Sequence, residues 1–150
     1  MTRTVTGAPA VPYGHAAPTL VHFDDLDAMG VLHNARYAVL VERAITTWWG
    51  ERGVSFAGGR PTTPDAFNVV REFGITYHAP VRGTVEIAIH FWIEHIGRSS
   101  ADYRFRVVSL DGEMLYAEGR RLAICLDPST MRPAPWSDRG RELAAALVSA

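Results

Sequence analysis

The chain has 150 residues, of which 47% are hydrophobic, so it is long enough for one globular domain with a sizeable core. Its formal net charge of −1 gives no sign of nucleic acid or anionic membranes as partners, and no stretch approaches the ~20 apolar residues of a membrane-spanning helix. The single cysteine excludes an intramolecular disulfide, and no signal-peptide pattern opens the chain, so we expect a cytoplasmic protein.

The first third of the chain predicts a tail, a strand and a long helix. Residues 1–16 are rich in Gly, Pro, Ala and Thr without periodicity, which indicates a flexible N-terminal tail before a single domain over residues 17–150. A strand is expected from about Pro18 to Asp24. A helix follows from Asn34, its expected N-cap, and ends near Gly50–Gly53. The helix is indicated by apolar residues at helical spacing, namely Tyr37, Leu40, Val41, Ala44, Ile45 and Trp48.

The rest of the chain predicts four long strands and a short helix. After a Gly- and Pro-rich loop over residues 57–64, apolar and polar residues alternate with a period of two. Short turns separate the strands, and Asp111-Gly112 marks a tight hairpin. The expected strands cover Phe67–His78, Val85–Ile93, Tyr103–Val107 and Met114–Leu126, and the helix covers Ser137–Val148 with Ser137 or Asp138 as its cap.

This order of elements predicts an α+β fold in which a curved sheet wraps a long central helix. Strands of ten or more residues exceed the usual ~5–6, which favours a strongly curved, mainly antiparallel sheet of five strands. One helix covers only one face of such a sheet, so we expect the other face and the sheet edges to need a partner subunit. Arg71 falls on an otherwise apolar strand face, where we expect it to pair with Glu42 or Glu72, with a subunit interface as the first expectation.

The most informative stretch is the Asp-rich turn before the helix. Asp24, Asp25 and Asp27 exceed what a helix cap needs, and we expect Asp24 and Asp25 to be solvated or to stabilise the turn. Asp27 precedes the free backbone N–H groups at the start of the helix. A carboxylate there can supply acid–base or nucleophilic chemistry, and the N–H groups can bind a developing anion. Met29 and Gly30 give the turn its shape, and Gly30 permits close approach of a substrate.

The residues from Asp25 to Tyr37 read as a D-x-D-x-x-G turn followed by N-x-x-Y, and Val41–Ala44 reads V-E-R-A within the helix. This pattern resembles the signature of the hotdog-fold acyl-CoA thioesterases of the 4-hydroxybenzoyl-CoA thioesterase type. The likeness continues through Phe73–Pro80, similar to the family's strand with a Tyr-x-x-Pro turn, and through Ile96–Ser100, similar to its Gly-x-Ser hairpin. Together the motifs cover about residues 18–127.

The resemblance implies the hotdog fold and hydrolysis of acyl-CoA or acyl carrier protein thioesters to free acid and thiol. It also implies homodimers whose sheets join edge to edge, dimers of dimers that make a homotetramer, and an active site between two subunits. Asp27 matches the family's catalytic carboxylate, as nucleophile or general base, and Asn34 matches the position whose backbone N–H faces the thioester oxygen. No cofactor is implied, because CoA is part of the substrate.

Further substrate-binding residues are expected near Asp27 and in the Gly-x-Ser hairpin. His33 is expected either in the pocket wall or at the surface, and Tyr37 in the core with a hydroxyl that reaches the Asp27 loop. The histidines show no metal-ligand spacing, so we predict no metal site. Cys125 is expected to pack inertly within a strand. The substrate-binding candidates are Met29, Gly30, His33, Tyr37, Arg98 and Ser99, and the candidates for contacts to CoA phosphates are Arg82, Arg98, Arg120 and Arg121.

Two other functions stay open at this point. A hotdog 3-hydroxyacyl-thioester dehydratase or hydratase needs a paired Asp and His, but five residues separate Asp27 from His33 rather than four, and the usual Asn-Pro is missing. A non-catalytic protein that binds acyl thioesters has no need of the Asp27 carboxylate. The chain contains no G-x-S-x-G, G-x-G-x-x-G or Walker lysine motif, so a serine elbow is excluded and nucleotide-dependent chemistry is not supported.

Overall fold

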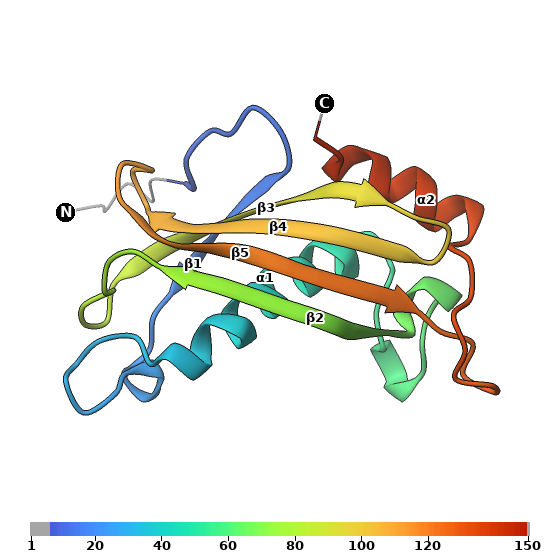
Figure 1. The fold of residues 1–150 in the computed structure, drawn as a ribbon, viewed down its shortest axis with the longest axis horizontal. Coiled ribbons are helices and arrows are strands. Elements are labelled where there is room, and N and C mark those ends of the chain that lie inside the picture. The colour runs from blue at the N-terminus through green and yellow to red at the C-terminus, as the bar shows by residue number, and fades with distance from the viewer. Residues whose placement is uncertain (1–6, 150) are drawn as a thin grey trace.

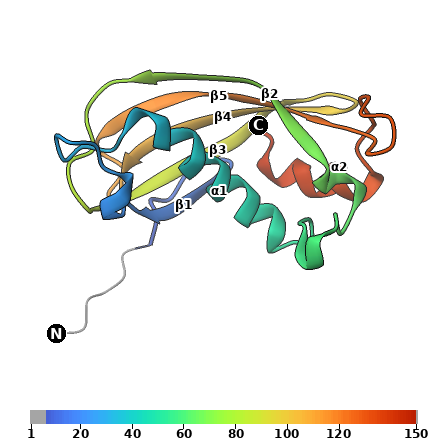
Figure 2. The ribbon, with the colours of Figure 1, turned by 90° about the horizontal axis from the view of Figure 1, so that it is seen from below.

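A five-stranded antiparallel sheet curves around one long helix in the computed structural model, which describes residues 7–149 (Figures 1 and 2). The strands lie in the order β1-β3-β4-β5-β2, so β1 and β2 form the two edges of the sheet. This confirms the predicted α+β architecture. The elements are β1 (His15–Leu20), α1 (Tyr37–Gly50), β2 (Asn68–Tyr77), β3 (Glu86–Ile96), β4 (Ser100–Ser109), β5 (Leu115–Cys125) and α2 (Asp138–Ala144).

Helix α1 and the concave face of the sheet form the hydrophobic core. The six apolar residues that predicted the helix face are all buried. From the sheet, alternate residues such as Ile89, Phe91 and Phe105 are 0–1% exposed and belong to the same cluster. Burial of one such side chain is worth roughly 1.5–3 kcal/mol, so this helix–sheet contact is the main source of stability. Neither helix in residues 7–149 has the length and hydrophobicity that a lipid bilayer requires of a spanning segment.

Helix α1 begins three residues later than predicted, and Asn34 is not its N-cap. Residues Asn34–Arg36 form a 3-10 turn, and His33 is the cap of that turn. The His33 Nδ1 atom accepts a hydrogen bond of 3.0 Å from the Ala35 N–H. The prediction was wrong because a neutral imidazole nitrogen can accept from a free helical amide just as an asparagine oxygen does.

The first strand lies closer to the N-terminus in the structure than the sequence predicts. Strand β1 begins at His15 and ends at Leu20, whereas the sequence predicts Pro18–Asp24, and residues 23–25 form a 3-10 turn instead. The predicted tail over residues 1–16 is therefore too long by at least two residues, and its residues 1–6 lie outside the described residues.

Arg71 does not pair with either predicted glutamate. It is exposed and lies in a β-bulge, where the register of β2 against β5 shifts. Glu42 pairs with Arg121 and Glu72 pairs with Arg120, each at 3.0 Å. A bulge changes the face to which later residues point, and counting with a period of two does not detect it.

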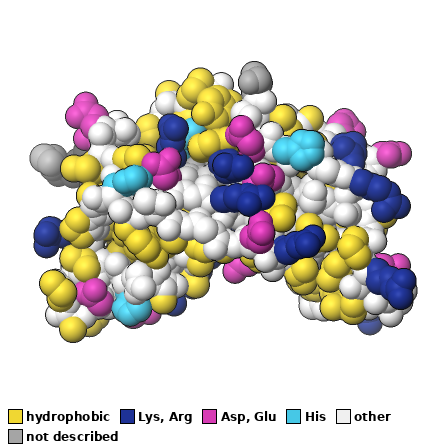
Figure 3. All heavy atoms as spheres, viewed as in Figure 1, with side chains coloured by type: hydrophobic (Ala, Val, Ile, Leu, Met, Phe, Trp, Pro, Cys, Tyr) yellow, Lys and Arg dark blue, Asp and Glu magenta, His cyan; other side chains and the backbone are white. Residues whose placement is uncertain are grey.

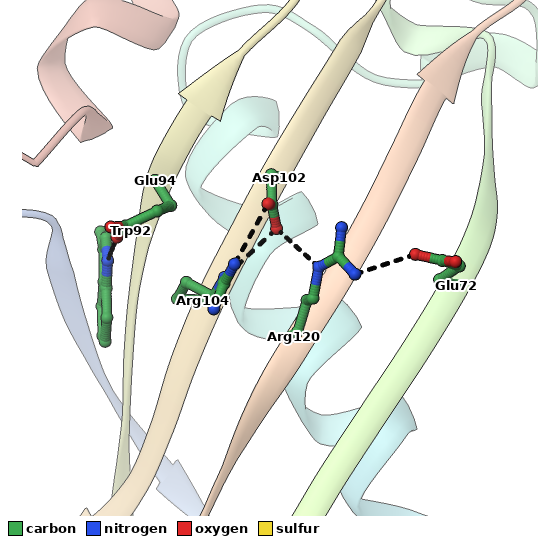
Figure 4. A network of polar contacts seen from close by, with 6 residues as sticks. All are labelled: Glu72, Trp92, Glu94, Asp102, Arg104 and Arg120. Atoms are coloured by element: carbon green, nitrogen blue, oxygen red, sulfur yellow. Dashed lines mark hydrogen bonds and ion pairs between the residues drawn. The ribbon is translucent and has the colours of Figure 1, made fainter.

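The outer face of the sheet carries charged side chains among its apolar ones (Figure 3). Asp102 of β4 accepts from Arg104 and from Arg120, and Arg120 also pairs with Glu72 across the β2–β5 ladder (Figure 4). Opposite charges on adjacent strands stabilise a sheet modestly and hydrate well. These charged groups are therefore compatible with contact between this face and water, and the covering subunit stays a prediction.

A buried aspartate attaches α2 to the rest of the fold. Asp65 is 3% exposed, and its carboxylate accepts hydrogen bonds from the Ser137 N–H at 2.8 Å and the Ser137 hydroxyl at 2.6 Å. Ser137 in turn accepts from the Gly140 N–H, which confirms it as the cap of α2. A Cβ at Gly140 would come within 2.4 Å of the Asp65 carboxylate, so this contact also requires a glycine.

We predict that Asp65→Ala lowers the free energy of unfolding by about 3 kcal/mol, because the N–H and hydroxyl of Ser137 lose their buried acceptor. Urea denaturation followed by tryptophan fluorescence measures this loss. Asp138→Ala, which removes an exposed carboxylate from the same helix end, serves as the control and should cost less than about 1 kcal/mol. Equal losses in the two variants would contradict the anchoring role of Asp65.

Candidate functional site

Asp27 lies in a tight turn that holds one of its carboxylate oxygens. The Asp27 N–H donates to the Val31 carbonyl at 2.9 Å, and Gly30 adopts a φ of 74° that favours glycine. Oδ1 of Asp27 accepts from the Met29 N–H at 2.8 Å and from the Val31 N–H at 3.3 Å. No described residue donates to Oδ2, so the turn orients the carboxylate and leaves one oxygen available for chemistry.

Asp27 borders a cleft of about 380 Å³ at the start of α1. The ring of Tyr37 forms one wall and meets the ring of Tyr77 edge to face, with centroids 5.1 Å apart. Three sequence-predicted site residues, Asp27, Asn34 and Tyr37, are thus brought together. The other lining residues are Val31, Leu32, His78, Ala79 and Pro80.

The backbone at Asn34 offers a hydrogen-bond donor in this cleft. The Asn34 N–H makes no hydrogen bond with any described residue. The next peptide is held at both ends, since its carbonyl on Asn34 accepts from the Tyr77 hydroxyl at 3.1 Å and its N–H on Ala35 donates to His33 at 3.0 Å. Asn34 therefore supplies the predicted free amide, although through a fixed backbone and not through a capping side chain.

An ion pair between the buried Asp25 and Arg36 stabilises the Asp27 turn. Asp25 is 1% exposed and accepts from the Arg36 Nε at 2.9 Å and from the His22 N–H at 2.9 Å. Burial alone would raise the pKa of Asp25, but the hydrogen bond from His22 and the Arg36 guanidinium outweigh it and lower that pKa below its usual value. The Asp25 carbonyl also accepts from the His33 N–H. Asp25 thus stabilises the turn, as predicted, while Asp24 is exposed.

The remaining predicted residues are more dispersed. Met29 is 83% exposed at the tip of the turn beside Gly30, and His33 is exposed with its ring on the backbone of the helix start. Arg98 and Ser99 lie in the β3–β4 hairpin, at the opposite end of β3 from the residues that adjoin the Asp27 turn (Figure 1). A single chain does not bring them to the cleft, so their role in binding stays a prediction.

The turn after β2 also lines the cleft, although none of its residues is among the predicted site residues. Tyr77, His78 and Pro80 line the cleft, and His78 pairs with Glu118 at 2.8 Å. The Tyr-x-x-Pro motif from Tyr77 to Pro80 is the sequence signal that marks this wall. The tyrosine reaches Asn34 only because β2 ends beside the start of α1.

The other arginines that are candidates for contacts to CoA phosphates, and Cys125, differ in their surroundings. Arg82 adjoins the Asp27 turn through a backbone bridge to Val31, whereas Arg120 and Arg121 are engaged in ion pairs. Burial raises the pKa of the Cys125 thiol to about 12, which keeps it protonated and confirms its inert packing in β5. Among residues 7–149, no three His, Cys, Asp or Glu side chains gather as a metal ion would require.

Comparison with known proteins supplies a family. A family model described as the thioesterase superfamily matches residues 29–116, a range that begins just after Asp27. The acyl-CoA thioester hydrolase YbgC of Escherichia coli O157:H7 is 30% identical over 116 residues, which cover 77% of this chain and 84% of that protein. A solved protein of Pseudomonas aeruginosa PAO1 has a TM-score of 0.79 at 26% identity, covering 91% of this chain and 93% of its own. A Thermus thermophilus thioesterase solved with coenzyme A and zinc has a TM-score of 0.71 at 24% identity, covering 88% and 92%, which shows the same fold.

We predict that Asp25→Asn lowers the free energy of unfolding by about 2 kcal/mol at pH 7, because Arg36 loses its charged partner. Since the folded-state pKa of Asp25 is lowered, its contribution is complete above the ordinary carboxyl pKa of about 4 and is lost as the pH falls through the folded-state value. Denaturant unfolding at a series of pH values checks this. The difference between wild type and variant should be constant from pH 7 to about 5 and shrink below about 4. The same curves for Asp24→Asn, which changes an exposed carboxylate, should coincide with wild type.

Proposed function

This chain belongs to the thioesterase superfamily and is a thioester hydrolase of the hotdog fold, and we propose that it cleaves acyl-CoA or acyl carrier protein thioesters to free acid and thiol. The observation that carries this proposal is the cleft lined both by Asp27, whose Oδ2 has no described donor, and by Asn34, whose N–H has no described acceptor. The printed name of the E. coli relative, an acyl-CoA thioester hydrolase, supports the CoA substrate. The Asp27 turn supports the finer assignment to the 4-hydroxybenzoyl-CoA thioesterase type.

Asp27 is proposed as the catalytic carboxylate. As a nucleophile, Oδ2 attacks the thioester carbonyl carbon, the C–S bond breaks with departure of the thiolate, and water then hydrolyses the mixed anhydride. As a general base, the same oxygen takes a proton from the water that attacks the carbonyl. The hydrogen bonds from Met29 and Val31 to Oδ1 keep Oδ2 directed away from the turn in either case.

The Asn34 N–H is proposed as the donor to the oxyanion. The carbonyl oxygen gains negative charge in the transition state, and a fixed amide at the start of a helical segment stabilises it without reorganisation. One such donor is worth roughly 10²–10³ in rate. Because a carboxylate is a weak nucleophile, this stabilisation supplies much of the proposed rate enhancement.

A second subunit is part of the proposal. Strand β2 is an edge strand, and its exposed residues include Val69, Val70 and Tyr77, each 42–48% exposed. Such an edge is suited to pairing with a copy of itself, which gives a homodimer with the active site between two subunits and, by further association, a dimer of dimers. We place the reaction in the cytoplasm, with which the single thiol agrees, and assign it no cofactor.

A hydratase mechanism receives no support from the cleft. Such chemistry would need His33 beside Asp27 as an acid–base partner. The His33 ring instead accepts from the Ala35 N–H, and it does not line the cleft. The proposed reaction therefore involves water and a single carboxylate.

We predict that Asp27→Asn lowers kcat/KM by about 10³-fold or more, because the variant lacks both nucleophile and base. Thiol release from short, long and aromatic acyl-CoAs measures the loss, and circular dichroism checks the fold. Asp24→Asn removes an exposed carboxylate three residues away and should leave turnover unchanged. A folded Asp27→Asn enzyme with near-normal turnover would refute the proposed role.

We also predict that Tyr77→Phe lowers kcat about tenfold with little change in KM, because the Asn34 carbonyl loses the hydroxyl that fixes its peptide. Tyr77 is a positioning residue here, so the split between kcat and KM distinguishes this role from a general loss of structure. Tyr13→Phe is the matched control, since the Tyr13 hydroxyl makes no hydrogen bond with any described residue. A rise in KM at unchanged kcat would instead place Tyr77 in substrate binding.

A further inference from the structure

Residues 8–14 form a strap, called here the N-terminal strap, over the outer face of the sheet. The strap turns back from the start of β1 toward the β4–β5 hairpin, which Pro9 contacts (Figure 1). At its other end, the ring of Tyr13 packs against His90 and Trp92 of β3, with centroids 5.6 and 5.3 Å away. These two side chains lie on the face of β3 opposite to the core, yet they are only 6% and 7% exposed. The strap therefore shields this part of β3 from water.

A glycine lets the strap fold back at the start of β1. Gly14 has a φ of 70°, and a Cβ there would collide with the Phe91 carbonyl oxygen and lie 2.8 Å from the Cβ of Trp92. A larger residue would displace the strap from β3. The rings of Pro9 and Pro12 each fix one backbone angle of the strap, so less conformational entropy is lost when it closes. The strap thus has one defined closed position.

His90 forms the polar contact between the strap and β3. Its Nε2 atom lies 2.9 Å from the Tyr13 carbonyl oxygen. Because a carbonyl oxygen only accepts, Nε2 must carry a hydrogen and donate it. Nδ1 makes no hydrogen bond with any described residue, so the neutral ring already completes the contact. A second proton would bind to Nδ1 and place a charge on a side chain that is almost fully buried.

The charged groups nearest to His90 are cations. Arg106 of β4 faces it directly in the strand register, and the Arg106 guanidinium lies over the Trp92 ring, 5.6 Å from its centroid. On β1, His15 adjoins the residue that pairs with His90. Burial lowers the pKa of His90, and Arg106 and His15 lower it further. These effects outweigh the hydrogen bond to the Tyr13 carbonyl, which raises that pKa.

The carboxylates on this part of the sheet lie farther away. Glu86 and Glu94 are each four residues from His90 along β3, which corresponds to roughly 13 Å. Glu94 accepts from the Trp92 Nε1 at 2.8 Å, and on β4 Asp102 is engaged with two arginines (Figure 4). A proton on His90 would therefore add a positive charge to a site whose nearest charged neighbours are cationic.

We propose that the N-terminal strap is an acid-sensitive cover, which neutral His90 holds closed over β3 and which is released when His90 binds a proton. The inference does not rest on the proposed function. In the released form His90 is solvated, with the ordinary histidine pKa of about 6.5. The closed form is fully favoured above that value and loses stability as the pH falls toward its own lower pKa. In this window one proton raises the ratio of released to closed strap by up to about tenfold per pH unit.

The first test follows both partners by NMR from about pH 7.5 to about 5, with [13C]histidine and [13C]tyrosine in the full chain. The His90 Cε1–H signal reports protonation, and the Tyr13 ring signals report release, because the ring leaves Trp92. Spectra of His90→Gln and Tyr13→Phe assign the two signals. We expect one common midpoint, with the Tyr13 signals moving to the positions of an exposed tyrosine. A Tyr13 ring that stays in place while His90 titrates would overturn the proposal.

Three variants separate His90 from other acid-sensitive groups. His90→Gln keeps a donor for the Tyr13 carbonyl but binds no proton, so the strap should stay closed at about pH 5. Arg106→Gln removes the opposing cation, which should raise the pH at which His90 titrates and reduce the fraction released. His95→Gln, at an exposed histidine of the same strand, is the control and should behave as wild type. Release that persists in His90→Gln, or an unchanged His90 midpoint in Arg106→Gln, would refute the mechanism.

A second measurement asks whether the release is local. Acrylamide quenching of Trp92, taken as the difference between wild type and Trp92→Phe, should rise several-fold between about pH 7.5 and about 5. Far-UV circular dichroism should stay constant over the same range. His90→Gln should show the low quenching of the closed form at both pH values. Low quenching in the wild type at both pH values, or loss of the circular dichroism signal with the same midpoint, would overturn a locally released strap.

Discussion

The ion pair between Asp25 and Arg36 is the contact on which the candidate site depends. It joins the 3-10 turn of residues 23–25, which follows β1, to the 3-10 turn of residues 34–36, which precedes α1, so the Asp27 turn between them is held at both of its ends. A buried carboxylate is costly unless it is paired and hydrogen-bonded, and Asp25 has both kinds of partner. Asp25 has this structural role, whereas Asp27 keeps one carboxylate oxygen, Oδ2, to which no described residue donates.

In this hotdog architecture, two cavities lie at opposite ends of helix α1. The cleft beside Asp27 lies at the start of α1, and a second cavity, lined in part by Trp49 and Tyr103, lies at its end, while β2 runs between them along the sheet edge. The proposed homodimer depends on the exposed β2 edge of this layout.

Much of the fold could be predicted from the sequence because its signals are local. The helical spacing from Tyr37 to Trp48 and the apolar faces of β3 and β4 follow from which side chains must be buried, and the structure buries these residues. In β3 the intervening Ala88, His90 and Trp92 are buried as well, so the strand does not alternate between a buried and an exposed face. The bulge at Arg71 was missed because it leaves the residue pattern unchanged while it shifts the strand register. The cap at His33 was missed because histidine is an uncommon cap.

By itself, the sequence determined the fold class, the thioesterase family and the turn that carries Asp27, since each of these depends on residues close together in the chain. Only the tertiary structure decided which groups share a cleft. It set Tyr77 on the Asn34 carbonyl and placed Arg98 at the far end of the sheet. It also formed the pocket around Tyr103 from segments distant in the chain. These relations depend on strand order and register, which bring distant residues together and leave no mark in any short stretch of sequence.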